Sequence, residues 1–230
     1  MTQTLAGGPI TTYSAYFFNR AGFSPTDAFN LSAGMYGLAI FAHCFALVLM
    51  TYVGRRPLYI FGCAASCATL FAAGIVGCLP ETKGTLWTVG ALVILMTFWY
   101  DLTIGPVCYS LVAEIPSTRL RVKTVVLGRV AYNIAVIISN VIMPLMLNPE
   151  AWNLKSKSCF VWGTTALISL VWAYYRLPEP KGLTYMELDV LFTKEVATRK
   201  FKKVQVRLQE SGYFELCEKV DQKHWEGVVT

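Results

Sequence analysis

The residue with the clearest chemical potential is Asp101, because its carboxylate lies inside a long apolar stretch. Between Arg56 and Glu114 the only other charged side chains are Glu81 and Lys83. An Asp at the centre of a transmembrane helix costs about 2.5–3.5 kcal/mol on insertion scales, so it normally faces the interior of a helix bundle. There it binds a substrate, relays a proton or makes a buried structural hydrogen bond. We expect Asp101 to line a cavity.

The first apolar segment, residues 2–18, carries more polar side chains than a lipid-facing helix would. Two glycines and a proline interrupt it, which frees backbone groups that only protein or a water-filled cavity can satisfy inside a membrane. Hydroxyl and amide groups beside aromatic rings suit a neutral polyol, although the same residue types also serve as packing contacts between helices. The residues concerned are Gln3, Thr4, Gly7, Gly8, Pro9, Thr11, Thr12, Tyr13, Ser14 and Tyr16.

Polar residues also occur in the apolar stretch 124–147. Asn133 and Asn140 are seven residues apart there, so they share one helix face, which indicates a cavity lining. His43 lies alone between apolar neighbours in another segment, and we expect it to be a packing residue rather than a proton carrier.

Composition decides the class of protein. Of 230 residues, 55% are hydrophobic and 15% are charged, whereas soluble chains carry about 25% charged residues. Apolar runs of this length exclude a soluble enzyme, and the many aromatic and β-branched residues exclude disorder. The net charge of +6 comes from bases scattered over short loops and an acid-balanced tail, so no nucleic-acid-binding face is expected.

The seven cysteines form no metal-binding or redox pattern. Six lie inside apolar runs, where cysteine behaves as a small hydrophobic residue. Cys63 and Cys67 are spaced i, i+4 rather than as a C-x-x-C motif. The sequence also has no His, Asp and Cys cluster near the membrane surface, so we expect no enzyme activity, no metal and no cofactor.

The apolar pattern predicts an all-α membrane protein with six transmembrane helices, because each segment approaches the roughly 20 residues that a span needs. Length and continuity favour helices over the short alternating strands of a β-barrel. The predicted spans are residues 2–18, 28–53, 57–79, 86–113, 124–147 and 158–177. Together they form a half-bundle over residues 1–181. Residues 182–230 are a polar tail, with an amphipathic helix predicted over residues 184–199.

The positions of arginine and lysine predict the orientation, because cytoplasmic loops are enriched in these residues. One side holds Arg55, Arg56, Arg119, Arg121 and Lys123, and the opposite side holds Arg20, Lys83, Lys155 and Lys157. The base-rich tail shares the first side and decides the assignment. We therefore place the tail and the G-R-R loop in the cytoplasm.

Charged residues of both signs gather at that predicted cytoplasmic face. They are Arg55, Arg56, Glu114, Arg119, Arg121 and Glu179. One interpretation is that they only set the topology and extend towards the headgroups. The other is a salt-bridge cluster that holds helix ends together and breaks when the bundle rocks.

These motifs, in this order, resemble the sugar porter branch of the major facilitator superfamily, and specifically the second half of the fungal maltose and α-glucoside permeases. The resemblance runs from Gln3 to about Phe201. Its pieces are Q-T-L-A-G and Y-S-A-Y-F-F-N-R-A-G (3–22), G-R-R-P-L-Y (54–59), D-L-T-I-G-P-V-C-Y-S-L-V-A-E-I-P-S-T-R-L-R-V-K-T (101–124), R-V-A-Y-N-I (129–134), P-L-M-L-N-P (144–149) and L-P-E-P-K-G-L-T-Y-M-E-L-D (177–189).

The resemblance implies roles for residues of the first segment. Gln3 falls where sugar porters have the first of two sugar-contacting glutamines, and Thr4 stands at the second. Tyr13 matches a tyrosine that closes over the site. Pro9 and Ala39 stand where the family has asparagines, and these departures argue against a plain glucose site.

Four later residues complete the substrate-binding set that the resemblance implies. Asp101 falls on a sugar-binding glutamate of hexose facilitators, and Tyr109 replaces a tryptophan near the sugar. Tyr132 and Asn133 replace an Asn-Trp pair. The cytoplasmic salt-bridge gate of the family falls on Arg55, Arg56, Glu114, Arg121 and Glu179.

The family has twelve spans in two six-helix halves, with the substrate held between them near the midplane. The resemblance therefore implies that this chain needs an N-terminal half, or a second half-bundle, for transport. It implies proton-coupled uptake of maltose or another α-glucoside by alternating access across the plasma membrane. A non-transporting sugar sensor, an inactive truncated transporter and a hexose transporter remain open.

Overall fold

The computed structural model describes residues 2–80, 82–116 and 121–181. Every regular element within these ranges is a helix, which confirms the predicted all-α fold. Arg119, the predicted tail and its amphipathic helix lie outside the described residues. The elements are α1 (Thr2–Leu5), α2 (Gly8–Thr12), α3 (Ser14–Ala21), α4 (Pro25–Tyr52), α5 (Arg55–Val76), α6 (Lys83–Trp99), the π-helix η1 (Tyr100–Ile104), α7 (Gly105–Glu114), α8 (Arg121–Leu147), the 3-10 helix η2 (Lys155–Lys157) and α9 (Ser158–Arg176).

Five helical segments of the described chain are long and apolar enough to cross a membrane. Three of them are α4, α5 and α8. The fourth joins α6, η1 and α7 over Lys83–Glu114, and the fifth joins η2 and α9 over Lys155–Arg176. All five lie over predicted spans, with ends that differ by a few residues.

The first predicted span, residues 2–18, differs from the expected single helix because it is divided into α1, α2 and α3. Gly7 separates α1 from α2 and has a φ of 105°, a left-handed conformation that glycine adopts without steric cost. The methyl group of Met96 packs where a Cβ on Gly7 would lie. Tyr13, at φ −102° and ψ 26°, separates α2 from α3. Close packing therefore holds the segment in its broken form.

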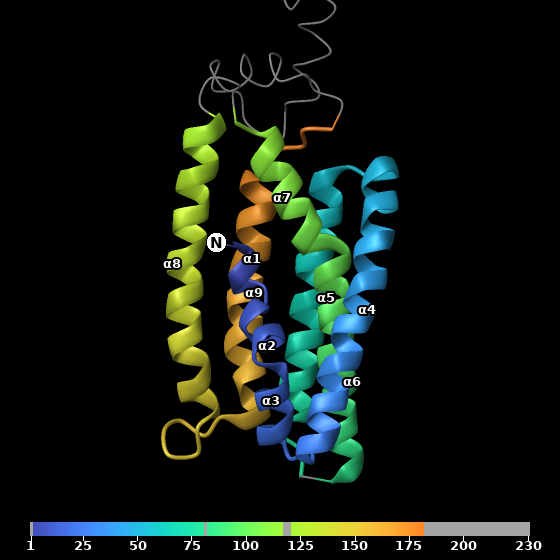
Figure 1. Ribbon diagram of the computed structural model, residues 1–230, viewed down its shortest axis with the longest axis vertical. Coiled ribbons are helices and arrows are strands. Elements are labelled where there is room, and N and C mark those ends of the chain that lie inside the picture. Colours follow the sequence, from blue (N-terminus) through green and yellow to red (C-terminus); the bar gives the residue numbers. More distant parts are fainter. Residues whose placement is uncertain (1, 81, 117–120, 182–230) are drawn as a thin grey trace, which may run out of the picture.

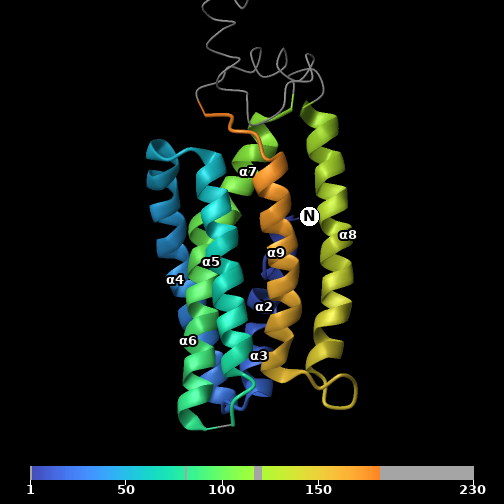
Figure 2. The ribbon, with the colours of Figure 1, turned by 180° about the vertical axis from the view of Figure 1, so that it is seen from behind.

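The central helix of the bundle is α5, which packs against α9, α6 and η1. Of the most apolar 18 residues of α5, 50% are buried. The corresponding buried shares are 17% in α4 and 22% in α8. Figure 1 shows α1 to α3 on one side of the bundle, with α8 and α4 at its two edges. Figure 2, from behind, shows α5 and α9 covering the opposite side. The broken segment thus lies on the side that α4 and α8 flank.

Buried apolar side chains form two clusters. One contains Phe17, Phe18 and Trp162 and joins α3 to α5, α6, α8 and α9. The other contains Leu58 and Leu111 and joins α5, α7 and α9. Because lipid tails are as apolar as these side chains, close packing rather than the hydrophobic effect holds such helices together.

The long segment Lys83–Glu114 changes its helical phase at η1. The backbone N–H of Gly105 donates to the carbonyl of Tyr100, five residues earlier, as in a π-helix. Pro106 follows and has no N–H to donate to the ladder. On the neighbouring helix, Gly62 lies so close to Thr103 and Ile104 that any side chain there would collide with them. A π turn rotates the following residues relative to a regular α-helix and is frequent at functional sites.

Candidate functional site

A polar cavity of about 250 Å³ lies between the broken first segment, η1 and α8. Its lining residues are Thr4, Gly8, Pro9, Thr11, Thr12, Tyr100, Tyr132, Val136, Ser139 and Asn140. The structure therefore places two of the predicted binding residues, Thr4 and Tyr132, in one cavity. Tyr13 lies beside it, with its hydroxyl 3.4 Å from the carbonyl oxygen of Asn140, to which it donates.

The hydroxyl of Thr4 is the cavity group with unused hydrogen-bonding capacity. Thr4 is 5% exposed, and its Oγ1 has no hydrogen-bond partner among the described residues. A buried polar group left in this way costs about 1–3 kcal/mol. By contrast, Thr11 donates to the carbonyl of Gly8 at 2.7 Å, and the Tyr100 hydroxyl donates to the carbonyl of Gln3 at 3.3 Å. Thr4 thus lines the cavity with a hydroxyl that is buried and unbonded in this structure.

A second, mainly apolar cavity of about 430 Å³ lies between α1, α7 and α8. Its lining residues are Gln3, Cys108, Tyr109, Val112, Val125, Val126, Gly128, Arg129 and Tyr132. Arg129 donates to the Tyr109 hydroxyl at 3.2 Å, and its guanidinium lies 5.0 Å from the ring centre of Tyr132. Tyr132 lines both cavities. Gln3 and Tyr109, both predicted, lie on the second cavity.

Asp101 and Asn133 lie outside the linings of both cavities. Asn133 is exposed on α8. Asp101 is half-buried, and a Cβ on Gly105 would lie 4.0 Å from its Oδ1 and 3.8 Å from Nε2 of His43 in α4. The residue of η1 that lines the polar cavity is Tyr100.

Several cavity residues carried too weak a sequence signal to be included in the predicted binding set. Tyr100 is one of many aromatic residues in an apolar stretch, and only its contact with Gln3, 97 residues away, gives it a role. Asn140 was noted as a polar position but was not included in the binding set, and Ser139 is a small polar residue in an apolar stretch. Within the described residues, no group of three or more His, Cys, Asp and Glu side chains has the arrangement of a metal site.

Most of the predicted salt-bridge gate lies at one end of the bundle. Arg55, at the start of α5, donates to the carboxylate of Glu114, at the end of α7, over 3.0 Å. Arg56 donates to the carbonyl of Tyr174 in α9 at 3.0 Å. Arg121 begins α8 at the same end (Figure 1). The contacts of Arg55 and Arg56 join α5 to α7 and to α9.

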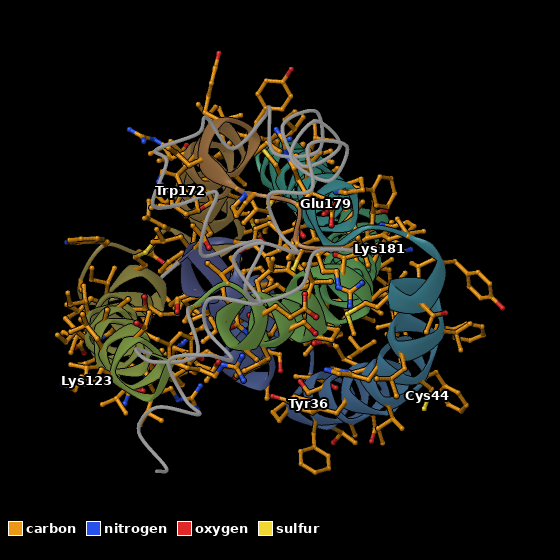
Figure 3. All side chains as sticks on the ribbon, turned by 90° about the horizontal axis from the view of Figure 1, so that it is seen from above. Tyr36, Cys44, Lys123, Trp172, Glu179 and Lys181 are labelled. Carbon is orange, nitrogen blue, oxygen red and sulfur yellow. The ribbon has the colours of Figure 1, made fainter. Side chains whose placement is uncertain are left out.

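Glu179 acts on the backbone rather than on the arginine side chains. Its two carboxylate oxygens accept the backbone N–H groups of Arg55 and Arg56, each at 3.0 Å. Lys181 extends the contact by donating to the carbonyls of Thr51 and Tyr52 at 3.0 and 2.7 Å. Figure 3 looks down on this end and shows Glu179 and Lys181 where α4 meets α5. The segment after α9 therefore caps two helix ends at once, the start of α5 and the end of α4.

The comparison with protein families matches residues 1–192 to the family described as "Sugar (and other) transporter". A maltose permease of Saccharomyces cerevisiae is 41% identical over 204 residues, which are 89% of this chain and 33% of the permease. An alpha-glucosides permease of the same species, strain YJM789, is 39% identical over 204 residues, with 89% and 34% covered. The chain thus spans about a third of the length of the curated relatives it matches.

Among solved structures, the chain is similar to the xylose transporter XylE from E. coli in its inward-open conformation. The TM-score is 0.61 at 20% sequence identity, and the match covers 79% of this chain and 41% of that one. At this identity the similarity shows the fold, which is that of a membrane transporter. The predicted major facilitator fold and the similarity to maltose and α-glucoside permeases are both confirmed.

Proposed function

Since the chain belongs to the sugar (and other) transporter family, we propose that it forms one half of the pathway by which an α-glucoside such as maltose crosses a membrane. The observation that carries the proposal is the polar cavity at the broken first segment. It offers an unbonded buried hydroxyl on Thr4 and the rings of Tyr100 and Tyr132. Hydroxyl groups exchange hydrogen bonds with a sugar while aromatic rings cover its C–H faces.

Two adjoining cavities favour a disaccharide over a single hexose. Small-molecule pockets are usually about 300–1,000 Å³ in volume, and the polar cavity alone, at about 250 Å³, falls below that range. The second cavity adds about 430 Å³ and shares Tyr132 with the first. One glucosyl unit would bond Thr4, while the other lies over the apolar wall beside Gln3 and Tyr109.

The proposed sugar contacts are those that the structure brings to the cavities. They are Gln3, Thr4, Tyr109 and Tyr132, with Tyr13 closing the site from beside Asn140. We assign no direct sugar contact to Asp101 or Asn133, because neither lines a cavity.

We further propose that a second six-helix unit completes the pathway. The two peripheral helices, α4 and α8, bury only 17% and 22% of their most apolar windows within this chain, and they flank the side that carries the broken segment (Figure 1). Polar groups on that side would otherwise meet lipid, at a cost of several kcal/mol for each unsatisfied group. The chain's share of about a third of its relatives' length is consistent with a missing unit.

Alternating access requires the two units to rock against each other, and the gate supplies contacts that can break and re-form. The Arg55–Glu114 bridge is partly exposed at 23% and 26%, and such pairs contribute about 0–1 kcal/mol. A bridge of that strength can be exchanged during each transport cycle. We place this end and the tail in the cytoplasm, the protein in the plasma membrane, and protons as the coupled ion, on the strength of the loop charges and the family resemblance.

The test uses yeast cells that lack their own maltose uptake, supplied with this chain together with the remaining part of a maltose permease relative. Labelled maltose should accumulate only when both parts are present, and unlabelled maltose should compete better than glucose. Thr4→Val should reduce the affinity for maltose by about tenfold, since one lost hydrogen bond is worth about 1.4 kcal/mol.

The matched control is Thr164→Val, which changes an exposed threonine of α9 that bonds only its own helix, at the carbonyl of Phe160. This variant should transport maltose as the parent does. If Thr4→Val and the parent took up maltose equally well, the sugar would not bind in the polar cavity. Maltose uptake by this chain alone would show that transport requires no second unit.

A further inference from the structure

The short helix α1 carries two of the proposed sugar contacts, Gln3 and Thr4, although it has only four residues. Gln3 is 8% exposed and Thr4 is 5% exposed, and the two side chains line different cavities. A helix of this length is almost entirely ends, where backbone N–H and C=O groups have no partner within the helix. Contacts from other helices must therefore hold α1, and with it both side chains, in position.

The sequence after α1 explains why its end needs an outside partner. In a continuous α-helix the carbonyl of Leu5 would accept the N–H of residue 9. Residue 9 is a proline, which has no N–H, and Gly7 turns the chain between the two in a left-handed conformation. The carbonyl of Leu5 thus lacks its regular helical donor. Inside a membrane such a group must be satisfied by protein or by water in a cavity.

Thr165 of α9 supplies a donor for this carbonyl. Its hydroxyl lies 2.7 Å from the carbonyl oxygen of Leu5 and 2.9 Å from that of Trp162, one turn earlier in α9. A threonine within a helix commonly bonds a carbonyl of its own preceding turn, but here the shorter contact crosses to α1. Figure 1 shows α1 against α9, the helix that it contacts. Thr165 thus ties the end of α1 to α9.

Tyr59 of α5 holds the other end of α1. Its hydroxyl lies 2.7 Å from the hydroxyl of Thr2, and either group can donate. Tyr59 is 2% exposed, and it belongs to the same buried apolar cluster as Ala6, the residue that follows α1. Because a buried tyrosine hydroxyl usually finds a hydrogen-bond partner, this contact fixes the start of α1 relative to α5.

A third hydroxyl reaches α1 from η1, where Tyr100 donates to the carbonyl of Gln3 at 3.3 Å. Hydroxyl groups of α5, η1 and α9 therefore hold this one short helix. Tyr100 also lines the polar cavity, whereas Tyr59 and Thr165 line neither cavity. An effect of Tyr59 or Thr165 on a sugar bound in these cavities must therefore pass through α1.

We propose that Tyr59 and Thr165 are positioning residues for sugar binding, which hold α1 at its two ends so that Gln3 faces one cavity and Thr4 the other. Successive residues of an α-helix point about 100° apart, so a rotation of α1 would move both side chains away from their cavities. Removal of either hydroxyl releases one end of α1 and weakens sugar binding without removing a sugar contact. The inference rests on the proposed transport function.

The first experiment measures amide hydrogen exchange of the purified chain in lipid nanodiscs, in peptides that cover residues 2–13 and α4. Thr165→Val and Tyr59→Phe should each speed exchange in residues 2–13 by about two- to tenfold, the effect expected from the loss of one hydrogen bond. Exchange in α4 should stay at the parental rate. Thr165→Ser keeps the hydroxyl and should exchange as the parent does.

Each variant has a matched control. Thr164→Val changes the neighbouring threonine, which is exposed and donates to a carbonyl of its own helix. Tyr52→Phe removes the hydroxyl of a tyrosine that is 80% exposed. Both controls should exchange as the parent does. Parental exchange of the first segment in Thr165→Val or in Tyr59→Phe would overturn the inference for that residue.

Uptake assays with the completed transporter test the consequence for the sugar. Thr165→Val and Tyr59→Phe should each raise the KM for maltose by about two- to tenfold and leave the maximal rate per transporter within about twofold of the parent, as expected when only binding is weakened. Thr165→Ser should restore the parental KM. A lower maximal rate at an unchanged KM would overturn the inference, because the two residues would then act on folding or on the transport cycle.

Failure of the proposed function would give a different result. If neither the parent nor any variant transported maltose, while exchange in residues 2–13 still rose in Thr165→Val and returned to the parental rate in Thr165→Ser, α1 would be held as inferred. That outcome would overturn the proposed function alone.

Discussion

Replacing Glu179 with alanine should detach the segment after α9 from the start of α5. The carboxylate of Glu179 accepts two backbone N–H groups, from Arg55 and Arg56, at 3.0 Å each. These are among the N–H groups of a helix start that have no partner within the helix. A negative charge at this position also interacts favourably with the helix dipole.

The expected loss of stability follows from these two hydrogen bonds. A hydrogen bond to a charged group contributes about 1.5–3 kcal/mol. Because Glu179 is half-buried and water can partly replace it, we take the lower value for each bond. The Glu179→Ala variant should therefore unfold with a free energy about 2–3 kcal/mol lower than the parent. Glu179→Gln keeps an accepting oxygen but loses the charge, and it should lose about 1 kcal/mol.

Gly54 offers an independent way to break the same contact. A Cβ on Gly54 would collide with the carboxylate of Glu179. Gly54→Ala should therefore displace Glu179 from the helix start and lower stability by a similar amount. Since both substitutions remove one contact, the double variant should be little less stable than either single variant.

The assay measures unfolding of the purified chain in detergent by the reactivity of its buried thiols. Cys63, Cys67 and Cys159 are buried, at 0%, 7% and 0% exposed, so they react readily with a maleimide dye only when the bundle opens. In the parent used for this assay, Cys44, Cys78, Cys108 and Cys217 are replaced with serine. Denaturant titration then gives the free energy of unfolding.

Glu150→Ala is the control, because Glu150 is an exposed carboxylate in the loop that joins α8 to η2. It should unfold as the parent does. If Glu179→Ala also matched the parent, or if the losses from Gly54→Ala and Glu179→Ala were additive, the carboxylate would not be capping α5.

Three further substitutions test the packing of the bundle and the site by the same assay. Gly62→Ala should lower stability by about 1–3 kcal/mol, because its Cβ would collide with Thr103. Its control is Gly34→Ala, whose added Cβ has no atom within 4 Å. This control should be as stable as the parent or more so. Gly7→Ala should lose at least about 1 kcal/mol, because alanine is disfavoured at a φ of 105°, and an unchanged midpoint would show that the first segment can straighten. Thr4→Val should keep or raise stability while it weakens maltose binding, because its hydroxyl has no partner among the described residues, and a clear loss of stability would contradict this.

The predicted binding residues divide into those that line a cavity and those that do not. Thr4 and Tyr132 line the polar cavity, and Gln3 lines the second one. Asp101 was expected to line a cavity by its chemistry, yet Tyr100 takes that place. The expectation for Asp101 rested on the cost of a charge in a membrane and on the resemblance, and neither determines which cavity a side chain reaches in the folded bundle.

The surroundings of His43 could not be predicted from the sequence. From its apolar neighbours we expected a packing residue, and nothing in the sequence relates it to Asp101, 58 positions later. Both lie near Gly105 because α4 packs against η1. The same is true of Glu179, which was expected to form a salt bridge and instead accepts backbone N–H groups.

The amino-acid sequence by itself determined the membrane class, the long apolar helices and the gathering of charges at one end. Those properties depend on how each segment divides between lipid and water, which is a matter of local composition. Only the tertiary structure decided where the first segment breaks, which face of η1 meets the cavity, and which groups meet across the bundle. Those outcomes depend on close packing between distant helices, as at Gly7 and Gly62, and a displacement of one residue along a helix changes which side chain faces its neighbour.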